Sequence, residues 1–135
     1  MVDVPPEISP SEELARDMSS REAKRRAKRK TGSLFREFIP KRGKVEVSVD
    51  RMTHAGEDQA RALAEARAAD HGRRFFGWSV IRADRANRNG RAVVPSPTSE
   101  PDNPYHADIV LPTNDRDEQK EHAQELAAEA VWRSA

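Results

Sequence analysis

The stretch from Val45 to Asp50 alternates valine with polar residues, and no other feature constrains the possible fold as strongly. Successive side chains on a β-strand point to opposite faces, so Val45, Val47 and Val49 would share one face and the polar residues between them the other. Such a strand needs a sheet that is covered on one side and polar on the other. The chain must therefore supply further strands and a covering layer.

Three more segments have strand character, and two have helical character. The strand candidates are FFGWSVIRA (75–83), RAVV (91–94) and NPYHADIVLP (103–112). The turn-forming pair Asn89-Gly90 favours a hairpin between the first two. Helical patterns cover 57–72 and 116–133, the latter with an apolar stripe through Ala123, Leu126, Ala127, Ala130 and Val131.

These elements predict an α+β fold. We expect a small two-layer sandwich, with a mostly antiparallel four-stranded sheet, two helices on one face of it, and a basic helical arm before it. The chain would divide into a polar N-terminal arm with a basic helix, partly disordered (1–44), and a compact α+β domain (45–135).

The expected arm helix begins at Ser9-Pro10, with Ser9 as N-cap and Glu12 closing a capping box, and ends near Gly32. Leu14 and Met18 are its large apolar residues, so it would have little to bury. We expect a helix that projects from the domain or becomes ordered on a partner.

Composition agrees with a compact domain that carries a polar arm. Leu, Ile, Val and Phe make up 23 of 135 residues, about 17%, which is below the roughly 20% at which order becomes doubtful. The net charge of +1 argues against disorder of the whole chain, because compositional disorder also needs a high net charge.

Residues 21–30, REAKRRAKRK, form a basic block in which seven of ten residues are Arg or Lys. Like charges at this density repel one another unless a polyanion or an acidic protein surface lies beside them. A solvated tail, an acidic protein partner and nucleic acid all fit this pattern, and nucleic acid would be bound mainly through its phosphates. The candidate nucleic-acid-binding residues are Arg21, Lys24, Arg25, Arg26, Lys28, Arg29, Lys30, Lys41, Arg42 and Lys44.

A second candidate site follows from alternation in the segment 103–112, where His106 and Asp108 share a face. If this strand lies beside 45–51, Glu46 and Asp50 join them in one polar patch. A carboxylate near an imidazole raises its basicity, and the arginine that follows Asp50 offers paired donors to an anion. The catalytic candidates are His106, Asp108, Asp50 and Arg51. An ordinary solvated sheet face, with Arg51 in a surface ion pair, fits the same pattern.

The sequence lacks the residues and motifs that are typical of several functional classes. There are no cysteines, so disulfides, zinc ribbons and thiol nucleophiles are excluded. None of the motifs H-E-x-x-H, G-x-S-x-G, G-x-G-x-x-G or the P-loop occurs. We therefore expect no cofactor and no metal, and favour a binding protein over an enzyme.

No stretch approaches the length of a membrane span, and the N-terminus lacks the pattern of a signal peptide. We expect a cytoplasmic protein without membrane contact, and the high Arg and Ala content is typical of GC-rich bacteria. The function we expect is that of a small bacterial accessory or adaptor protein that binds a larger protein partner, nucleic acid, or both through the basic arm. The alternatives are a small hydrolase or nuclease-like toxin that uses the His106 face, and a structural subunit whose arm folds on assembly.

Overall fold

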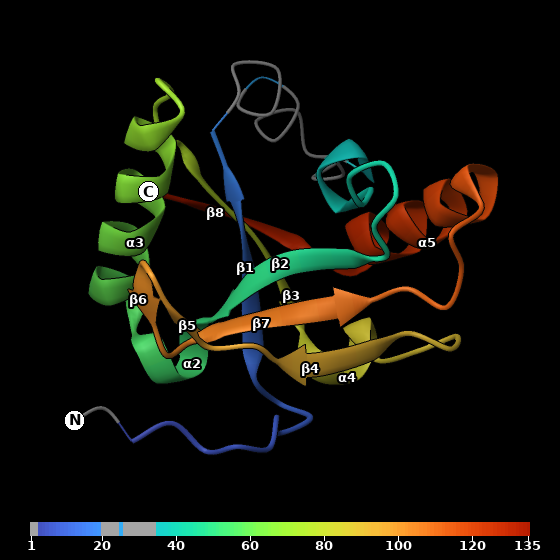
Figure 1. Ribbon diagram of the computed structural model, residues 1–135, viewed down its shortest axis with the longest axis horizontal. Coiled ribbons are helices and arrows are strands. Elements are labelled where there is room, and N and C mark those ends of the chain that lie inside the picture. The colour runs from blue at the N-terminus through green and yellow to red at the C-terminus, as the bar shows by residue number, and fades with distance from the viewer. Residues whose placement is uncertain (1–2, 20–24, 26–34) are drawn as a thin grey trace.

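A computed structural model of the protein describes residues 3–19, 25 and 35–135 (Figure 1). Its main sheet has six strands in the order β4-β7-β2-β1-β3-β8, and every pairing in it is antiparallel. These strands are β1 (Glu13–Met18), β2 (Glu46–Arg51), β3 (Gly77–Arg82), β4 (Ala92–Pro95), β7 (His106–Val110) and β8 (Val131–Ser134). A two-stranded ribbon joins β5 (Thr98–Ser99) to β6 (Asp102–Asn103). The helices are η1 (Phe35–Phe38), α2 (Met52–Ala55), α3 (Glu57–Asp70), α4 (Ala83–Ala86) and α5 (Arg116–Glu129).

The α+β class and the antiparallel sheet are confirmed, but the sheet has six strands where four were predicted. The two additional strands are β1 and β8, and both come from segments that were predicted to be helical. β8 begins directly after α5, which ends at Glu129, and pairs with β3 at the edge of the sheet. The predicted C-terminal helix was therefore too long.

The strand β1 replaces part of the predicted arm helix, so the helix prediction is wrong for Glu13–Met18. The capping contact itself exists, because the Ser9 N–H donates to Glu12 Oε2 over 2.7 Å. It closes a turn, after which the chain enters the sheet with Leu14 and the next residue, Ala15, both fully buried. Burial of successive residues requires a strand with both faces covered, which a projecting helix does not provide.

Most of the basic block lies outside the described residues, which include from it only Arg25, an exposed residue. The basic helical arm and the division of the chain at residue 44 stay predictions for that part. The six residues of β1, however, form hydrogen-bonded ladders with both β2 and β3, so they belong to the sheet.

Two separate cores lie on opposite faces of the sheet. On one face, Leu14 and Ile81 pack with Leu126 of α5. On the other face, Ala15 and the fully buried Trp78 pack with the alanines of α3. The prediction that both long helices cover one face is therefore wrong: α3 and α5 cover different faces, and Figure 1 shows α3 well separated from α5.

The Asn89-Gly90 pair forms the predicted tight turn, since both residues have positive φ (55° and 85°) and the Arg91 N–H donates to the Arg88 carbonyl over 3.0 Å. The strand that follows it, β4, pairs with β7 and not with β3, so the predicted hairpin is wrong. The short helix α4 intervenes and carries the chain to the opposite edge of the sheet. None of the described helices is long and apolar enough to cross a membrane.

Candidate functional site

The strands β1 and β2 pair over only a short distance and then diverge. Their ladder joins Leu14 to Arg51 and Ala15 to Asp50, whereas β1 and β3 pair along the whole of Glu13–Met18. We call the divergence beyond Ala15 the fork. Because two neighbouring strands separate here, backbone groups that would pair with one another within a sheet need other partners.

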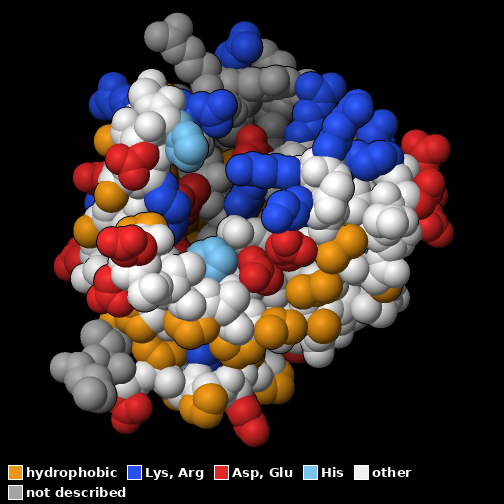
Figure 2. Space-filling model, in the orientation of Figure 1, with side chains coloured by type: hydrophobic (Ala, Val, Ile, Leu, Met, Phe, Trp, Pro, Cys, Tyr) orange, Lys and Arg blue, Asp and Glu red, His pale blue; other side chains and the backbone are white. Residues whose placement is uncertain are grey.

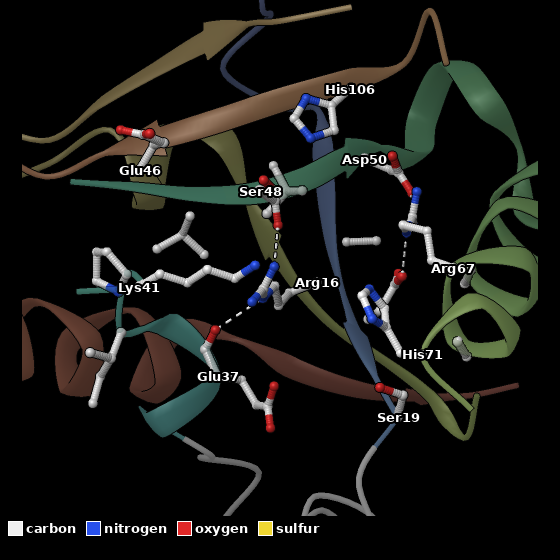
Figure 3. A pocket seen from close by; sticks show the side chains of 18 of the residues that line it. Arg16, Ser19, Glu37, Lys41, Glu46, Ser48, Asp50, Arg67, His71 and His106 are labelled. Atoms are coloured by element: carbon white, nitrogen blue, oxygen red, sulfur yellow. Dashed lines mark hydrogen bonds and ion pairs between the residues drawn. The ribbon is translucent and has the colours of Figure 1, made fainter. Parts of the chain in front are cut away.

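Arg16 supplies one such partner inside the fork. Its Nη1 donates to the carbonyl oxygen of Ser48 on β2 over 2.9 Å, and its Nε donates to the carbonyl of Glu37 in η1, also over 2.9 Å (Figure 3). One planar guanidinium thus joins two elements that backbone hydrogen bonds do not connect. Burial lowers the pKa of Arg16, although the charges of Glu37 and Asp17 oppose this effect.

The fork opens into a cavity of about 630 Å³, which we call the fork cavity. Its walls are β1, β2, the C-terminal half of α3 and the segment 37–44, which begins within η1. This volume falls within the range of about 300–1,000 Å³ that is typical of sites for small ligands. Figure 3 shows charged side chains from all of these walls directed toward the interior.

One wall contains a buried charge cluster. Arg67 of α3 donates from Nε to Asp17 over 2.7 Å and from Nη2 to Asp50 over 2.5 Å. Burial acts to lower the pKa of Arg67, but the hydrogen bond to Asp17 and the charges of both carboxylates raise it overall. Burial also raises the pKa of Asp17, in spite of Arg67. The second oxygen of Asp50 accepts from Asn103 over 2.9 Å, so Asp50 is fully engaged.

The mouth of the fork cavity is cationic. Lys41, Lys44 and Arg73 line it, and their side chains form no ion pair within the part of the chain that the structure describes. Figure 2 shows Lys and Arg side chains gathered around a hollow on this face of the molecule. Ser19, the last described residue before residue 20, and Glu37, in η1, line the same cavity.

His106 lies at the opposite wall, on β7. Its Nδ1 lies 3.0 Å from the carbonyl oxygen of Ser96 and 2.7 Å from the hydroxyl of the same residue. The Ser96 carbonyl can only accept, whereas its hydroxyl can accept from Nδ1 or donate to it, so these two contacts fit either neutral tautomer of the ring. In the tautomer that carries its proton on Nδ1, Nε2 has the lone pair that a general base uses.

The adjacency on which the predicted polar patch depended is confirmed. β2 pairs with β7 in a register that places Asp50 opposite His106 and Ser48 opposite Asp108. His106, Glu46 and Asp50 all line the fork cavity. Asp108 is bound differently, because its carboxylate accepts a long hydrogen bond of 3.4 Å from the Ser48 hydroxyl.

Arg51 is held by contacts within the protein. Its side chain is buried and forms a bidentate ion pair with Glu12, with both N–O distances 2.9 Å. It also donates to the carbonyls of Pro5 and Glu7, which fixes the N-terminal segment against the sheet. These contacts occupy the donors that the sequence suggested for an anionic substrate.

The predicted nucleic-acid-binding residues are described only in part. Lys41 and Lys44 lie at the cavity mouth, and Arg42 between them is exposed. Arg25 is exposed, and Arg21, Lys24, Arg26, Lys28, Arg29 and Lys30 lie outside the described residues.

Arg16, Arg67 and Arg73 were not among the predicted site residues. Arg16 and Asp17 stand next to each other in a segment that was predicted to be helical, and a strand prediction there would have placed them on opposite faces. Arg67 carried no signal, since charged residues are common on helices. Among the described residues, no three His, Asp or Glu side chains lie close enough together to hold a metal ion.

Comparisons of this chain with protein-family models, with curated proteins and with solved structures found no match.

Proposed function

We propose that this protein is a small accessory protein that binds nucleic acid through the cationic mouth of the fork cavity together with the basic block 21–30. The observation that carries the proposal is that Lys41, Lys44 and Arg73 converge on one opening without an acidic partner among the described residues. Cations that repel one another in the free protein gain a partner when a phosphate backbone lies across them.

The position of the basic block along the chain supports the same surface. Ser19, which precedes the block in the sequence, and Glu37, which follows it, both line the fork cavity. Lysine charges on flexible stems suit contacts to phosphates that do not depend on base sequence.

The test is binding of a fluorescent single-stranded oligonucleotide as a function of salt. The logarithm of the affinity should fall linearly with the logarithm of salt concentration, with a slope of about −0.7 for each phosphate neutralised on a single strand. The double variant Lys41→Gln/Lys44→Gln should bind more weakly and lower the magnitude of this slope by about 1.4.

The matched control is Arg88→Gln/Lys120→Gln, which removes the same charge from two exposed residues that do not line the cavity. It should bind as the unmodified protein does. If both double variants lose affinity equally, the attraction is a property of net charge and the proposed surface is wrong. Absence of any salt-dependent binding removes nucleic acid as the partner and leaves an acidic protein for the basic block.

A second candidate function is hydrolysis at His106, favoured by the position of this side chain on the wall of the fork cavity, where Ser96 holds its Nδ1. In this function the Nε2 lone pair of His106 would accept a proton from water or from a ribose hydroxyl of a strand bound at the cavity. The test is cleavage of labelled RNA by the unmodified protein and by His106→Ala, with His122→Ala as the control. Cleavage that is equal in both variants, or absent from the unmodified protein, rejects this function.

A further inference from the structure

Arg16 is a half-buried cation that forms no ion pair with any residue that the structure describes. Its guanidinium donates two hydrogen bonds to described residues, and both go to neutral carbonyl groups, those of Glu37 and Ser48. No carboxylate of a described residue lies within ion-pair distance of its guanidinium, and its Nη2 has no hydrogen-bond partner among the described residues. An unneutralised charge in a desolvated position is costly, and proteins normally pair it.

The acidic side chains around the cavity do not meet this need. Asp17 and Asp50 are already bound by Arg67 on the α3 side of the fork. Figure 3 shows the carboxylates of Glu37 and Glu46 turned away from the Arg16 guanidinium.

A second cation points to the same place. In Figure 3 the Lys41 side chain extends along the cavity and points toward Arg16. The Lys41 side chain forms no hydrogen bond or ion pair with any described residue. Two cations that line one concave site and point toward its interior can bind the same anion there.

We infer that the fork cavity binds a phosphate monoester, with its phosphate held between Arg16 Nη2 and Lys41. A phosphate monoester carries close to two negative charges at neutral pH and offers several acceptor oxygens, which matches two converging cationic donors. The cavity, at about 630 Å³, is much larger than a phosphate group needs, so an attached nucleoside-sized group fits as well. His106, on the opposite wall, then lies toward the attached group.

This site goes beyond the proposed binding of a nucleic-acid backbone. Phosphodiesters of a strand carry one charge each and would lie across the outer cations Lys44 and Arg73. The inner position at Arg16 selects a terminal group that can enter the cavity. The phosphate can come from a free nucleotide or from the phosphorylated end of a strand, and the experiment separates these two sources.

The experiment is a titration followed by amide and arginine side-chain NMR signals of the full chain. Adenosine 5′-monophosphate is the probe, and adenosine is the uncharged control. We expect the monophosphate, but not adenosine, to shift the Arg16 Nε–H signal and the amides of Ser48 and His106. Shifts confined to exposed residues outside the cavity, or equal shifts with adenosine, overturn the inference.

Variants localise the site. Arg16→Gln and Lys41→Gln should each weaken monophosphate binding by roughly tenfold or more, as loss of a charge-assisted hydrogen bond predicts. Lys120→Gln, on α5, should leave it unchanged. Lys41→Gln keeps the test decisive if Arg16→Gln fails to fold, because the exposed Lys41 side chain forms no hydrogen bond or ion pair with a described residue that the fold would lose. Unchanged binding in Lys41→Gln overturns the inference.

The source of the phosphate is tested with a short oligonucleotide that carries either a 5′-phosphate or a 5′-hydroxyl. Tighter binding of the phosphorylated strand, lost in Arg16→Gln, identifies a strand end as the ligand. If the strands bind alike while the monophosphate still shifts Arg16, the ligand is a free nucleotide. Backbone binding that survives without any monophosphate binding leaves the proposed function standing and overturns only the inner site.

Discussion

Arg16 and Ser48 face each other across the point where β1 and β2 separate, and the 2.9 Å hydrogen bond between them takes the place of a backbone ladder contact. A side chain therefore satisfies a carbonyl that a continuous sheet would satisfy with an N–H group. The strands remain apart as a result, and the fork cavity occupies the space between them. The candidate site thus exists because the backbones of β1 and β2 separate, and charged residues line the cavity between them.

Gly77 is predicted to be essential for docking β8. It has φ 149°, and a Cβ built on it would lie 2.5 Å from the Arg133 carbonyl oxygen and 2.7 Å from the Trp132 ring. Gly77→Ala should therefore destabilise the protein by about 1–3 kcal/mol in urea unfolding. It should also increase hydrogen exchange at the amides of residues 131–134, which pair with β3, and of Ala135, whose N–H donates to the Phe76 carbonyl.

Gly72→Ala is the control for this variant. Gly72 also has positive φ, 64°, but nothing lies within 4 Å of an added Cβ. It should cost only the backbone strain of about 1 kcal/mol and leave the exchange of β8 unchanged. Equal exchange of β8 in both variants would show that close approach at Gly77 is not what holds this strand.

Gln119 is predicted to anchor the segment that carries the mouth cations. Its side chain is buried, and Nε2 donates to the carbonyls of Lys44 and Thr113, both over 3.0 Å. Gln119→Leu removes the side-chain donor to both carbonyls and one of the two acceptors of Arg116 Nη1, which keeps the Pro40 carbonyl, so the unfolding free energy should fall by about 2–4 kcal/mol. Gln124→Leu, an exposed position on the same helix, should change it by less than about 0.5 kcal/mol. Similar losses in the two variants would contradict this anchoring role.

Arg67 is predicted to favour the binding of anions in the fork cavity. Without it, Asp17 and Asp50 would be unpaired carboxylates on one wall. Arg67→Gln should weaken adenosine monophosphate binding and, because the arginine is 35% exposed, cost only about 1–3 kcal/mol of stability. Adding Asp17→Asn to this variant should restore part of both losses. Arg61→Gln, the same charge change on the same helix, should not affect monophosphate binding, and an equal effect would contradict the prediction.

The parts of the fold that the sequence predicted well are those in which side-chain pattern and structure coincide. The alternation at Val47 and Val49 gave a strand with the expected buried face. α3 and α5, the latter as far as Ala127, follow their alanine and leucine spacing, and Asp115 caps α5 by accepting from the Glu118 N–H over 3.0 Å. In these segments local preference and tertiary packing favour the same element.

The strands that the sequence did not predict gain their stability from partners that lie far away in the chain. β1 has the small residue Ala15 on one face, which is buried only because α3 packs on it, and its ladders join segments more than thirty residues away. β8 continues an apolar helical stripe, yet Val131 is 68% exposed and Trp132 packs beside Met18. Pairing energy of this kind overrides helix propensity and leaves no local trace.

The candidate site divides in the same way. The alternation of side chains along each strand predicted that His106, Asp50 and Glu46 could share one face. The pairing of β2 with β7 places them together on the wall of the fork cavity. The fork, and with it Arg16, depends on where the β1–β2 ladder stops. That point is set by tertiary packing, so spacing along the chain does not reveal it.

The last prediction concerns the buried ion pair between Glu12 and Arg51. Burial acts to raise the pKa of Glu12, but the Arg51 hydrogen bond and charge, the Ser9 N–H and His54 together lower it below the ordinary value of 4.5. Between its folded-state pKa and 4.5 the unfolded chain binds more protons than the folded protein does, so stability rises with pH in this window. The contribution of Glu12 is therefore complete above pH 4.5 and is lost as the pH falls through the folded-state pKa.

Glu12→Gln removes the charge and leaves the Arg51 guanidinium buried without its partner. At neutral pH the variant should lose about 3 kcal/mol of unfolding free energy in urea, as expected for breaking one side of a buried pair. The difference from the unmodified protein should shrink at an acidic pH below 4.5, as the pH falls through the folded-state pKa of Glu12 and protonation removes the same charge. Glu65→Gln, at an exposed position of α3, should show no such pH-dependent difference. A gap for Glu12→Gln that stays constant between the two pH values would mean that packing, and not the charge of Glu12, fixes the N-terminal segment to the sheet.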